Sequence, residues 1–164
     1  MSMLLLAVMH IAAVAYAAIG GVFLAFSDFL MRSLSRSPGA SGIETMQSIN
    51  REVFRWVFMS LFLGMAPVSL LLGLVAAPRV EANAALPILL AAGAYLVGCF
   101  GVTVAFNVPM NQALAAMTPP DDRALAYWAD RYLPRWTFWN TVRTVACVFA
   151  STMMMLGLIR MAVG

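Results

Sequence analysis

Four long runs of apolar residues, separated by polar connections, dominate the chain. Each run is long enough to cross a bilayer, because a spanning helix needs about 20 predominantly apolar residues. The pattern predicts spanning helices over roughly 3–26, 56–77, 86–106 and 136–162. Pro67 lies inside the second run, where we expect a kink rather than a break, since spanning helices tolerate proline.

The first run has a second interpretation, a secretory signal peptide, because Ala15-Tyr16-Ala17 resembles a cleavage site. However, the residues before the run, Met1-Ser2-Met3, contain no basic side chain, and the run is longer than a signal core. We therefore expect this segment to be retained as a helix.

Two of the three connections are long and polar. The Pro and Gly content of 37–42 and 118–122 predicts a turn in each. Apolar residues then recur at helical spacing over 43–55 and 123–132, which predicts a short amphipathic helix in each connection. The connection 78–85 is short. We expect an all-α membrane protein, a single four-helix domain over residues 1–164.

The sequence also matches itself when it is shifted by 80 positions (101 minus 21). Gly21-Val22 then lies on Gly101-Val102, and Arg55-Trp56 lies on Arg135-Trp136. Shared arginines and tryptophans are hard to obtain by chance, so we predict a tandem repeat with halves of approximately 1–80 and 81–164. Each half contains two spans, so the repeat is parallel, with a pseudo-two-fold axis along the membrane normal.

A row of small residues on the first span predicts where two helices approach closely. The row comprises Ala13, Ala17, Gly21 and Ala25, and its images in the third span are nearly as small. Small residues allow helix backbones to pack closely in lipid. We therefore expect the first and third spans to be in contact.

Composition supports a membrane location and excludes other classes. Hydrophobic residues make up 63% of the chain and charged residues 10%, whereas soluble domains are roughly a quarter charged. The net charge of +3 comes from arginines beside the spans, without a basic run, so we expect no nucleic-acid partner. Most arginines lie in the two long connections, which therefore face the cytoplasm by the positive-inside rule, with both termini outside.

The start of the fourth span has the most informative helical spacing. Trp136, Trp139, Asn140 and Arg143 lie at i, i+3, i+4 and i+7, so they share one face. An arginine two turns into a spanning helix costs roughly 2 to 3 kcal/mol unless it is paired or faces a wet cavity. Alternatively, the arginine extends back to the interface and the tryptophans form an ordinary aromatic belt.

Asn107 and Asn111 flank Pro109 on the same side of the membrane. We expect broken backbone there, with both amides facing a pocket, because irregular backbone at that depth is tolerated only against protein or a cavity. Arg143 is expected to meet one of these amides, a carboxylate or a bound polar molecule. The alternative is that the amides simply cap a helix end.

Metal and disulfide chemistry is not indicated. His10 is the only histidine and is far from the polar face, and Cys99 and Cys147 lie in separate apolar runs without ligand spacing. We therefore expect no metal site.

The stretches 104–114 and 132–144, together with 26–36 and 46–51, resemble the anthrone oxygenase-like family of small membrane proteins. The resemblance covers nearly the whole chain. It implies a location in the bacterial inner (plasma) membrane. Most bacterial members of the family are known only as a domain of unknown function. A few fungal relatives oxidise polyketide anthrones to anthraquinones without metal or flavin, which implies no cofactor. Many relatives carry His where this chain has Thr141, which puts a histidine base in doubt here.

The resemblance implies a cofactor-independent oxygenase acting on a lipophilic phenolic or anthrone-like substrate. The residues we assign to the chemistry are Arg143, Asn140, Asn107 and Asn111, with Arg143 as the cation that holds the substrate anion. Those assigned to substrate binding are Trp136, Trp139, Asn50 and Arg51. The base would be Asp28, Asp130 or a water held by the amides.

A non-enzymatic function is the alternative. Arginine beside interfacial tryptophan suits an anionic lipid equally well, so the same face would bind a lipid, a lipophile or a partner protein. Membrane lipids are the expected surroundings in both cases. The physiological substrate and the oligomeric state stay open.

Overall fold

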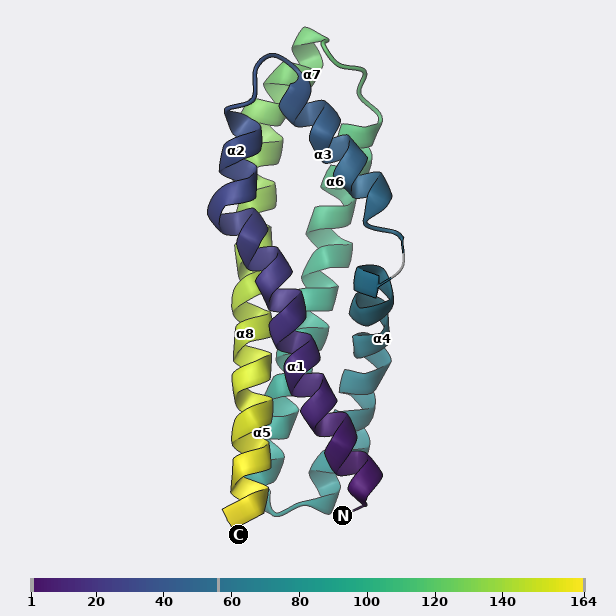
Figure 1. The fold of residues 1–164 in the computed structure, drawn as a ribbon, viewed down its shortest axis with the longest axis vertical. Helices are drawn as coiled ribbons and strands as arrows, with labels where there is room; N and C mark the ends of the chain where they lie inside the picture. The colour runs from purple at the N-terminus through teal and green to yellow at the C-terminus, as the bar shows by residue number, and fades with distance from the viewer. Residues whose placement is uncertain (1, 56, 164) are drawn as a thin grey trace.

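The computed structural model describes residues 2–55 and 57–163, and this part of the chain is helical without a strand (Figure 1). Four of its helical stretches are long and apolar enough to cross a membrane: Met3–Ser35, Val57–Arg79, Ala82–Ala115 and Asp122–Val163. They indicate a multi-pass membrane protein. Trp56, which begins the second predicted span and matches Trp136 in the repeat, lies outside the described residues.

The first stretch comprises α1 (Met3–Ala25), a π-helical turn (Phe26–Leu30) and α2 (Met31–Ser35). Ser2 caps α1 by accepting a hydrogen bond from the backbone N–H of Leu5. The first long connection contains α3 (Ser41–Glu52), which packs beside α2 and α6. Figure 1 shows α3 at the end of the bundle away from the two termini.

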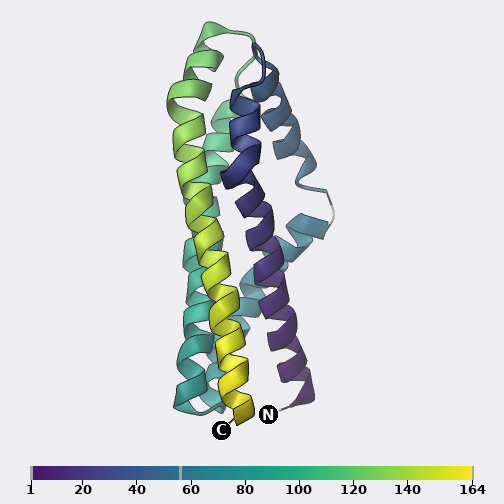
Figure 2. The same cartoon turned by 60° about the vertical axis from the view of Figure 1, so that its left-hand side comes forward.

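The second stretch comprises α4 (Val57–Leu71), a π-helical turn (Leu72–Ala76) and a 3₁₀ turn (Ala77–Arg79). Pro67 lies inside α4, and the helix continues past it, as expected for a spanning helix. In Figure 2 the start of α4 is displaced outward from the other helices, next to the connection from α3.

The third stretch contains α5 (Ala82–Gly93), π-helical segments (Ala94–Gly101 and Thr103–Asn107) and α6 (Val108–Ala115). The prediction of broken backbone around Pro109 is therefore wrong. Pro109 lies inside the continuous helical stretch Ala82–Ala115, just after the π-helical segment Thr103–Asn107, and such local π geometry lets a spanning helix accommodate a proline.

The fourth stretch comprises α7 (Asp122–Tyr127), a π-helical turn (Trp128–Tyr132) and α8 (Leu133–Val163). The segment expected as a separate amphipathic helix is the beginning of this long helical stretch. Pro134 does not interrupt it, because the π-helical turn Trp128–Tyr132 just before this proline gives the local backbone adjustment that it needs.

α8 packs between α1 and α5, with α1 on one side and α5 on the other (Figure 2). Glycines make these approaches close. An ideal Cβ placed on Gly20 would lie 3.0 Å from Cβ of Cys147, and one placed on Gly98 would lie 2.7 Å from Cβ of Ala146. Small residues therefore allow α8 to pack against both neighbours.

The close packing predicted between the first and third spans through a row of small residues is wrong. Ala17 and Gly21 are exposed, and a Cβ added to Gly21 would meet nothing within 4 Å. The first and third spans meet through larger side chains instead, with the rings of Tyr16 and Tyr95 centred 5.0 Å apart. The reason is that α8 takes the position that the repeat argument assigned to the third span.

Buried apolar side chains of the described residues gather in two clusters. One fills the bundle between the spanning helices and includes Tyr16, Tyr95 and Met154. The other lies beneath α3 and includes Met46 and Trp136. The buried guanidinium of Arg143 lies between the two clusters, because it contacts Phe23 of the first and Trp136 of the second.

Candidate functional site

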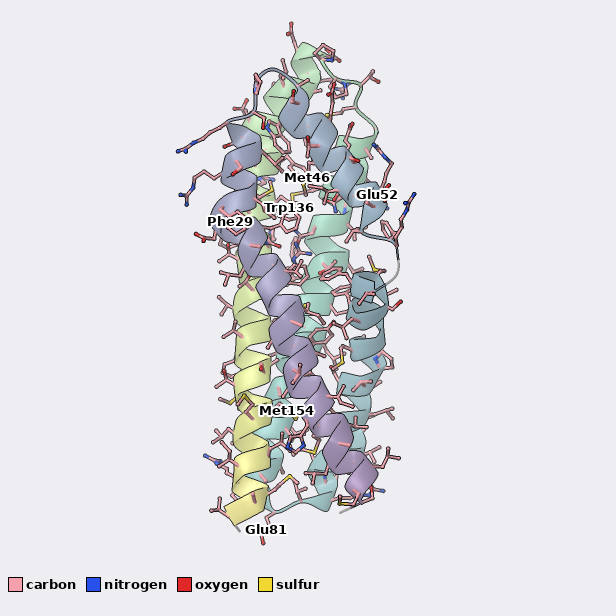
Figure 3. All side chains as sticks on the ribbon, viewed as in Figure 1. Phe29, Met46, Glu52, Glu81, Trp136 and Met154 are labelled. Atoms are coloured by element: carbon pink, nitrogen blue, oxygen red, sulfur yellow. The ribbon has the colours of Figure 1, made fainter. Side chains whose placement is uncertain are left out.

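A cavity of about 100 Å³ lies beneath α3, between α1, α4, α6 and α8. Met46 and Trp136, labelled in Figure 3, mark its level in the bundle. Most of its wall is apolar and aromatic, formed by Val22, Phe23, Phe26, Met46, Ile49, Val53, Phe54, Phe58, Met59, Phe62, Val108 and Trp136. Its polar lining comes from Asn50, Thr103, Asn111 and Arg143. Such a wall suits a flat, apolar ligand that carries a few polar atoms.

Arg143 is buried in the bundle, with 4% of its surface exposed. Its Nη2 donates a hydrogen bond of 2.6 Å to Oδ1 of Asn140, and its Nη1 donates one of 3.3 Å to the hydroxyl of Thr103. The guanidinium lies over the ring of Phe23, 4.1 Å from its centre, and 5.2 Å from the ring centre of Trp136. The side chain therefore points into the bundle and not toward the interface.

The charge of Arg143 has no counter-ion within the described residues. The ion pair found there joins Arg55 to Glu52 on the surface, and no carboxylate lies within 4.0 Å of Arg143. In addition, Nε of Arg143 is buried without a hydrogen-bond partner. A buried cation is normally paired, so this one retains both a charge and a donor for a bound anion.

The amide of Asn111 is held by two donors from the fourth helical stretch. Its Oδ1 accepts hydrogen bonds of 2.8 Å from the hydroxyl of Tyr132 and 2.8 Å from Nε1 of Trp136. Asn50 extends this network by donating to the hydroxyl of Tyr132 at 3.4 Å. Because its oxygen is engaged twice, Asn111 can offer its NH₂ group to the cavity that it lines.

Two further buried amides hold the helices around the cavity. Asn140 is fully buried, and its Nδ2 donates to the backbone carbonyl of Phe23 at 2.6 Å and to the hydroxyl of Ser27 at 2.7 Å. Asn107 donates to the backbone carbonyl of Trp136 at 3.3 Å, while its Oδ1 has no partner. Asn140 therefore ties α8 to α1, and Asn107 ties α8 to the third stretch.

The family model for anthrone oxygenase matches residues 52–153, more than half of the chain. The chain belongs to the anthrone oxygenase family. No curated protein matches it, and no solved structure matches it. The matched region includes Asn111, Trp136 and Arg143 of the cavity. Phe23 and Asn50 lie N-terminal to it.

The predicted site residues fall into three groups. Arg143, Asn111, Trp136 and Asn50 line the cavity. Asn140 and Asn107 are buried behind the lining, where they hold Arg143 and Trp136. The third group, Trp139 and Arg51, does not reach the cavity.

Trp139 stacks on Phe106 instead, with ring centres 3.7 Å apart and planes 3° from parallel. Phe106 is exposed, so this stacked pair lies toward the surface of the bundle and outside the cavity lining. Arg51 is exposed on α3. The sequence assignment of both residues to substrate binding has no support in this geometry, because neither side chain lines the cavity.

The carboxylates considered as bases are also outside the cavity. Asp28 and Asp130 are both exposed, and neither belongs to its lining. Thr141, at the position where many relatives carry His, is exposed too, and it donates hydrogen bonds to Ser27 and to the carbonyl of Thr137. Of the bases that we considered, a water held by the cavity amides remains.

Three residues of the site were missed from the sequence. Tyr132 orients Asn111, Thr103 accepts from Arg143, and Phe23 lies against the guanidinium. Tyr132 could have been found from its spacing, because Tyr132 and Trp136 at i and i+4 lie on one helix face. Nothing in the local sequence indicates Phe23, because its contact with Arg143 joins the first helix to the last.

Proposed function

We propose that this protein is a cofactor-independent oxygenase that acts on a lipophilic phenolic or anthrone-like substrate. The observation that carries the proposal is the buried Arg143, which lines an aromatic cavity, has no carboxylate partner among the described residues and has a buried Nε without a hydrogen-bond partner. Membership of the anthrone oxygenase family supports the reaction class.

The substrate rings would lie between the aromatic side chains of the cavity, with the ketone oxygen toward Arg143. Burial strengthens the attraction between the guanidinium and a developing oxyanion, since the site excludes most water. The NH₂ group of Asn111 supplies a second donor for a neighbouring phenol or carbonyl oxygen. Phe23 and Trp136 contact both the guanidinium and the cavity, so they position the cation and the substrate rings together.

The reaction begins when the methylene carbon opposite the ketone loses a proton to water held by the cavity amides. The resulting anion is delocalised onto the ketone oxygen, where Arg143 stabilises it. One electron passes to dioxygen, and combination of the two radicals with return of a proton forms a hydroperoxide at that carbon. Loss of water from the hydroperoxide leaves a second ketone. Overall, a CH₂ group and O₂ become a C=O group and H₂O.

Oxygen uptake by the purified protein in detergent micelles tests this function directly. A panel of anthrones and quinols should include a compound that is oxidised with one O₂ consumed for each quinone formed. With oxygen-18 gas, the new ketone should carry one labelled atom and the released water the other. Uptake no faster than that of the uncatalysed reaction across the panel would refute the oxygenase function.

The alternative is a non-enzymatic protein that holds an anionic lipid or lipophile in the same cavity. One observation favours it, namely that the described residues of the cavity lining include no aspartate, glutamate or histidine that could act as a base. A lipid that remains bound through purification and is released on substitution of Arg143, without any oxygen uptake, would support this function.

We also propose that the protein lies in the bacterial inner membrane with both long connections in the cytoplasm. The arginine distribution supports this orientation, since only Arg79 and Arg160 lie at the opposite end. The parallel tandem repeat of approximately 1–80 and 81–164, with α3 in the first long connection corresponding to the beginning of the fourth helical stretch in the second, is part of the same proposal. The alignment of Arg51 with Arg131 and of Arg55 with Arg135 supports it.

A further inference from the structure

An apolar groove of about 560 Å³ lies between the first helix and α4, at the end of the bundle opposite the Arg143 cavity. Leucine and valine side chains from both helices form its wall, including Leu5, Val8 and Leu71. Polar side chains appear only at one end, where Ser2 and Arg79 lie. Figure 1 places this end of the bundle near the two chain termini.

The length of the groove corresponds to one leaflet of a bilayer. Its lining on the second helical stretch extends from Val68 to Arg79, which is 11 residues (79 minus 68). At 1.5 Å per residue this is about 16 Å, roughly half of the 30 Å hydrocarbon core. A single acyl chain in that leaflet would therefore lie along the groove with its polar end beside Arg79.

A second pocket, of about 220 Å³, adjoins the first through Arg79. Arg160, Glu81 and Asn83 also line it. Figure 3 labels Glu81 at this end of the bundle. The shared arginine joins an apolar groove to a polar pocket, which is the arrangement of an acyl chain and its headgroup.

The two arginines of the polar pocket retain donors for a ligand. Nη1 of Arg79 donates to the carbonyl of Val75 at 2.5 Å, and Nη1 of Arg160 donates to the carbonyl of Asn83 at 2.7 Å. In the described part of the chain, neither forms an ion pair with Glu81. Since a guanidinium carries five N–H donors, each arginine has several that these contacts do not use.

We propose that this end of the protein binds one anionic phospholipid. The phosphodiester lies between Arg79 and Arg160, and one acyl chain follows the groove between α1 and α4. The two arginines and Glu81 carry a net charge of +1, which complements a headgroup with a net charge of −1. This site is separate from the Arg143 cavity and is independent of the oxygenase function.

Native mass spectrometry with defined lipids tests the headgroup site. Dioleoyl phosphatidylglycerol should bind the wild-type protein more tightly than dioleoyl phosphatidylcholine. Each of Arg79→Gln and Arg160→Gln should weaken phosphatidylglycerol binding about fivefold, since one arginine near a charged surface contributes about that factor. Arg135→Gln, a substitution of an exposed arginine at the other end of the bundle, serves as the matched control and should leave this binding unchanged.

A groove variant tests the position of the acyl chain and does not depend on the arginines. Leu71 is 58% exposed, so Leu71→Trp places a large ring in the groove without disturbing the core. It should weaken the binding of dioleoyl phosphatidylglycerol but not of a short-chain lipid with the same headgroup.

Three results would overturn the proposal. The first is equal binding of the two dioleoyl lipids, and the second is unchanged phosphatidylglycerol binding in both arginine variants. The third is a dimer of the wild-type protein that Leu71→Trp dissociates while lipid binding is unchanged. The last would show that the groove binds a second copy of the chain.

Discussion

Replacing Arg143 with glutamine separates a binding role from a structural one. The substitution removes the positive charge and leaves a shorter, neutral amide side chain that lacks Nη2, the donor that Arg143 directs to Oδ1 of Asn140 at 2.6 Å. If the charge stabilises the substrate anion, kcat/KM should fall about 10²- to 10³-fold, as it does when a donor to an oxyanion is lost. Arg143→Lys keeps the charge without the planar guanidinium, so its kcat/KM should lie between those of the wild-type protein and Arg143→Gln.

The stability of the same variant should change little. In the wild-type protein, two hydrogen bonds and the contact with Phe23 at 4.1 Å offset a desolvation cost of several kcal/mol. Glutamine loses part of these stabilising contacts, but it also avoids most of the desolvation cost because it carries no charge. We expect the free energy of unfolding to change by no more than about 1 kcal/mol, which for a chain of this size corresponds to roughly 2–4 °C in Tm.

The assay combines initial rates of oxygen uptake with thermal unfolding of the same preparation. Arg135→Gln is the matched control, because Arg135 is an exposed arginine on the same helix, and it should change neither quantity. A ligand measurement adds a third readout. A bound hydroxyanthraquinone should show its ionised absorption band at lower pH with the wild-type protein than with Arg143→Gln, because the cation favours the phenolate. Full activity in Arg143→Gln, or a loss of activity matched by a large fall in Tm, would refute the reasoning.

Three other predictions concern the fold around the site. Asn111→Leu should destabilise the protein by roughly 2–4 kcal/mol in denaturant titrations, because it strands the buried donors of Tyr132 and Trp136, whereas Tyr132→Phe should cost about 1 kcal/mol. Gly98→Ala should lower the free energy of unfolding by about 1–3 kcal/mol because the added methyl group crowds α8. Gly21→Ala, where the methyl group would enter open space, should leave stability unchanged or raise it. Equal Tm values for the two variants would contradict this packing. Single cysteines at positions 40 and 121 should be labelled from one side of the membrane and one at position 82 from the other, against a background in which the native cysteines are buried.

The helical architecture was largely predictable because it follows from the solvent. In lipid, backbone groups must bond within their own helix, so a long apolar run has few alternatives. The ends of the helices were less predictable. The helix continues past Asn107 and Pro109, where we expected broken backbone, because the π-helical segment before the proline accommodates it.

The candidate site was predictable where one helix carries it. Trp136, Asn140 and Arg143 are close in sequence, and α8 brings them to one buried face as their spacing predicted. Trp139 shows the limit of that argument. It lies between them in the sequence but stacks on Phe106 of the third stretch, because the neighbouring helix, and not the spacing alone, determines which side of α8 is enclosed.

The sequence by itself determined that this protein has four membrane-length helices and that an arginine lies among buried amides at one end of the bundle. Only the tertiary structure decided what surrounds that arginine. Phe23 and Thr103 come from helices far apart in the chain, and α8 meets both because it packs between the first and third helical stretches. Helix formation depends on local backbone bonding, whereas the order of packing depends on close approaches such as that of Gly98 to Ala146, which no single segment specifies.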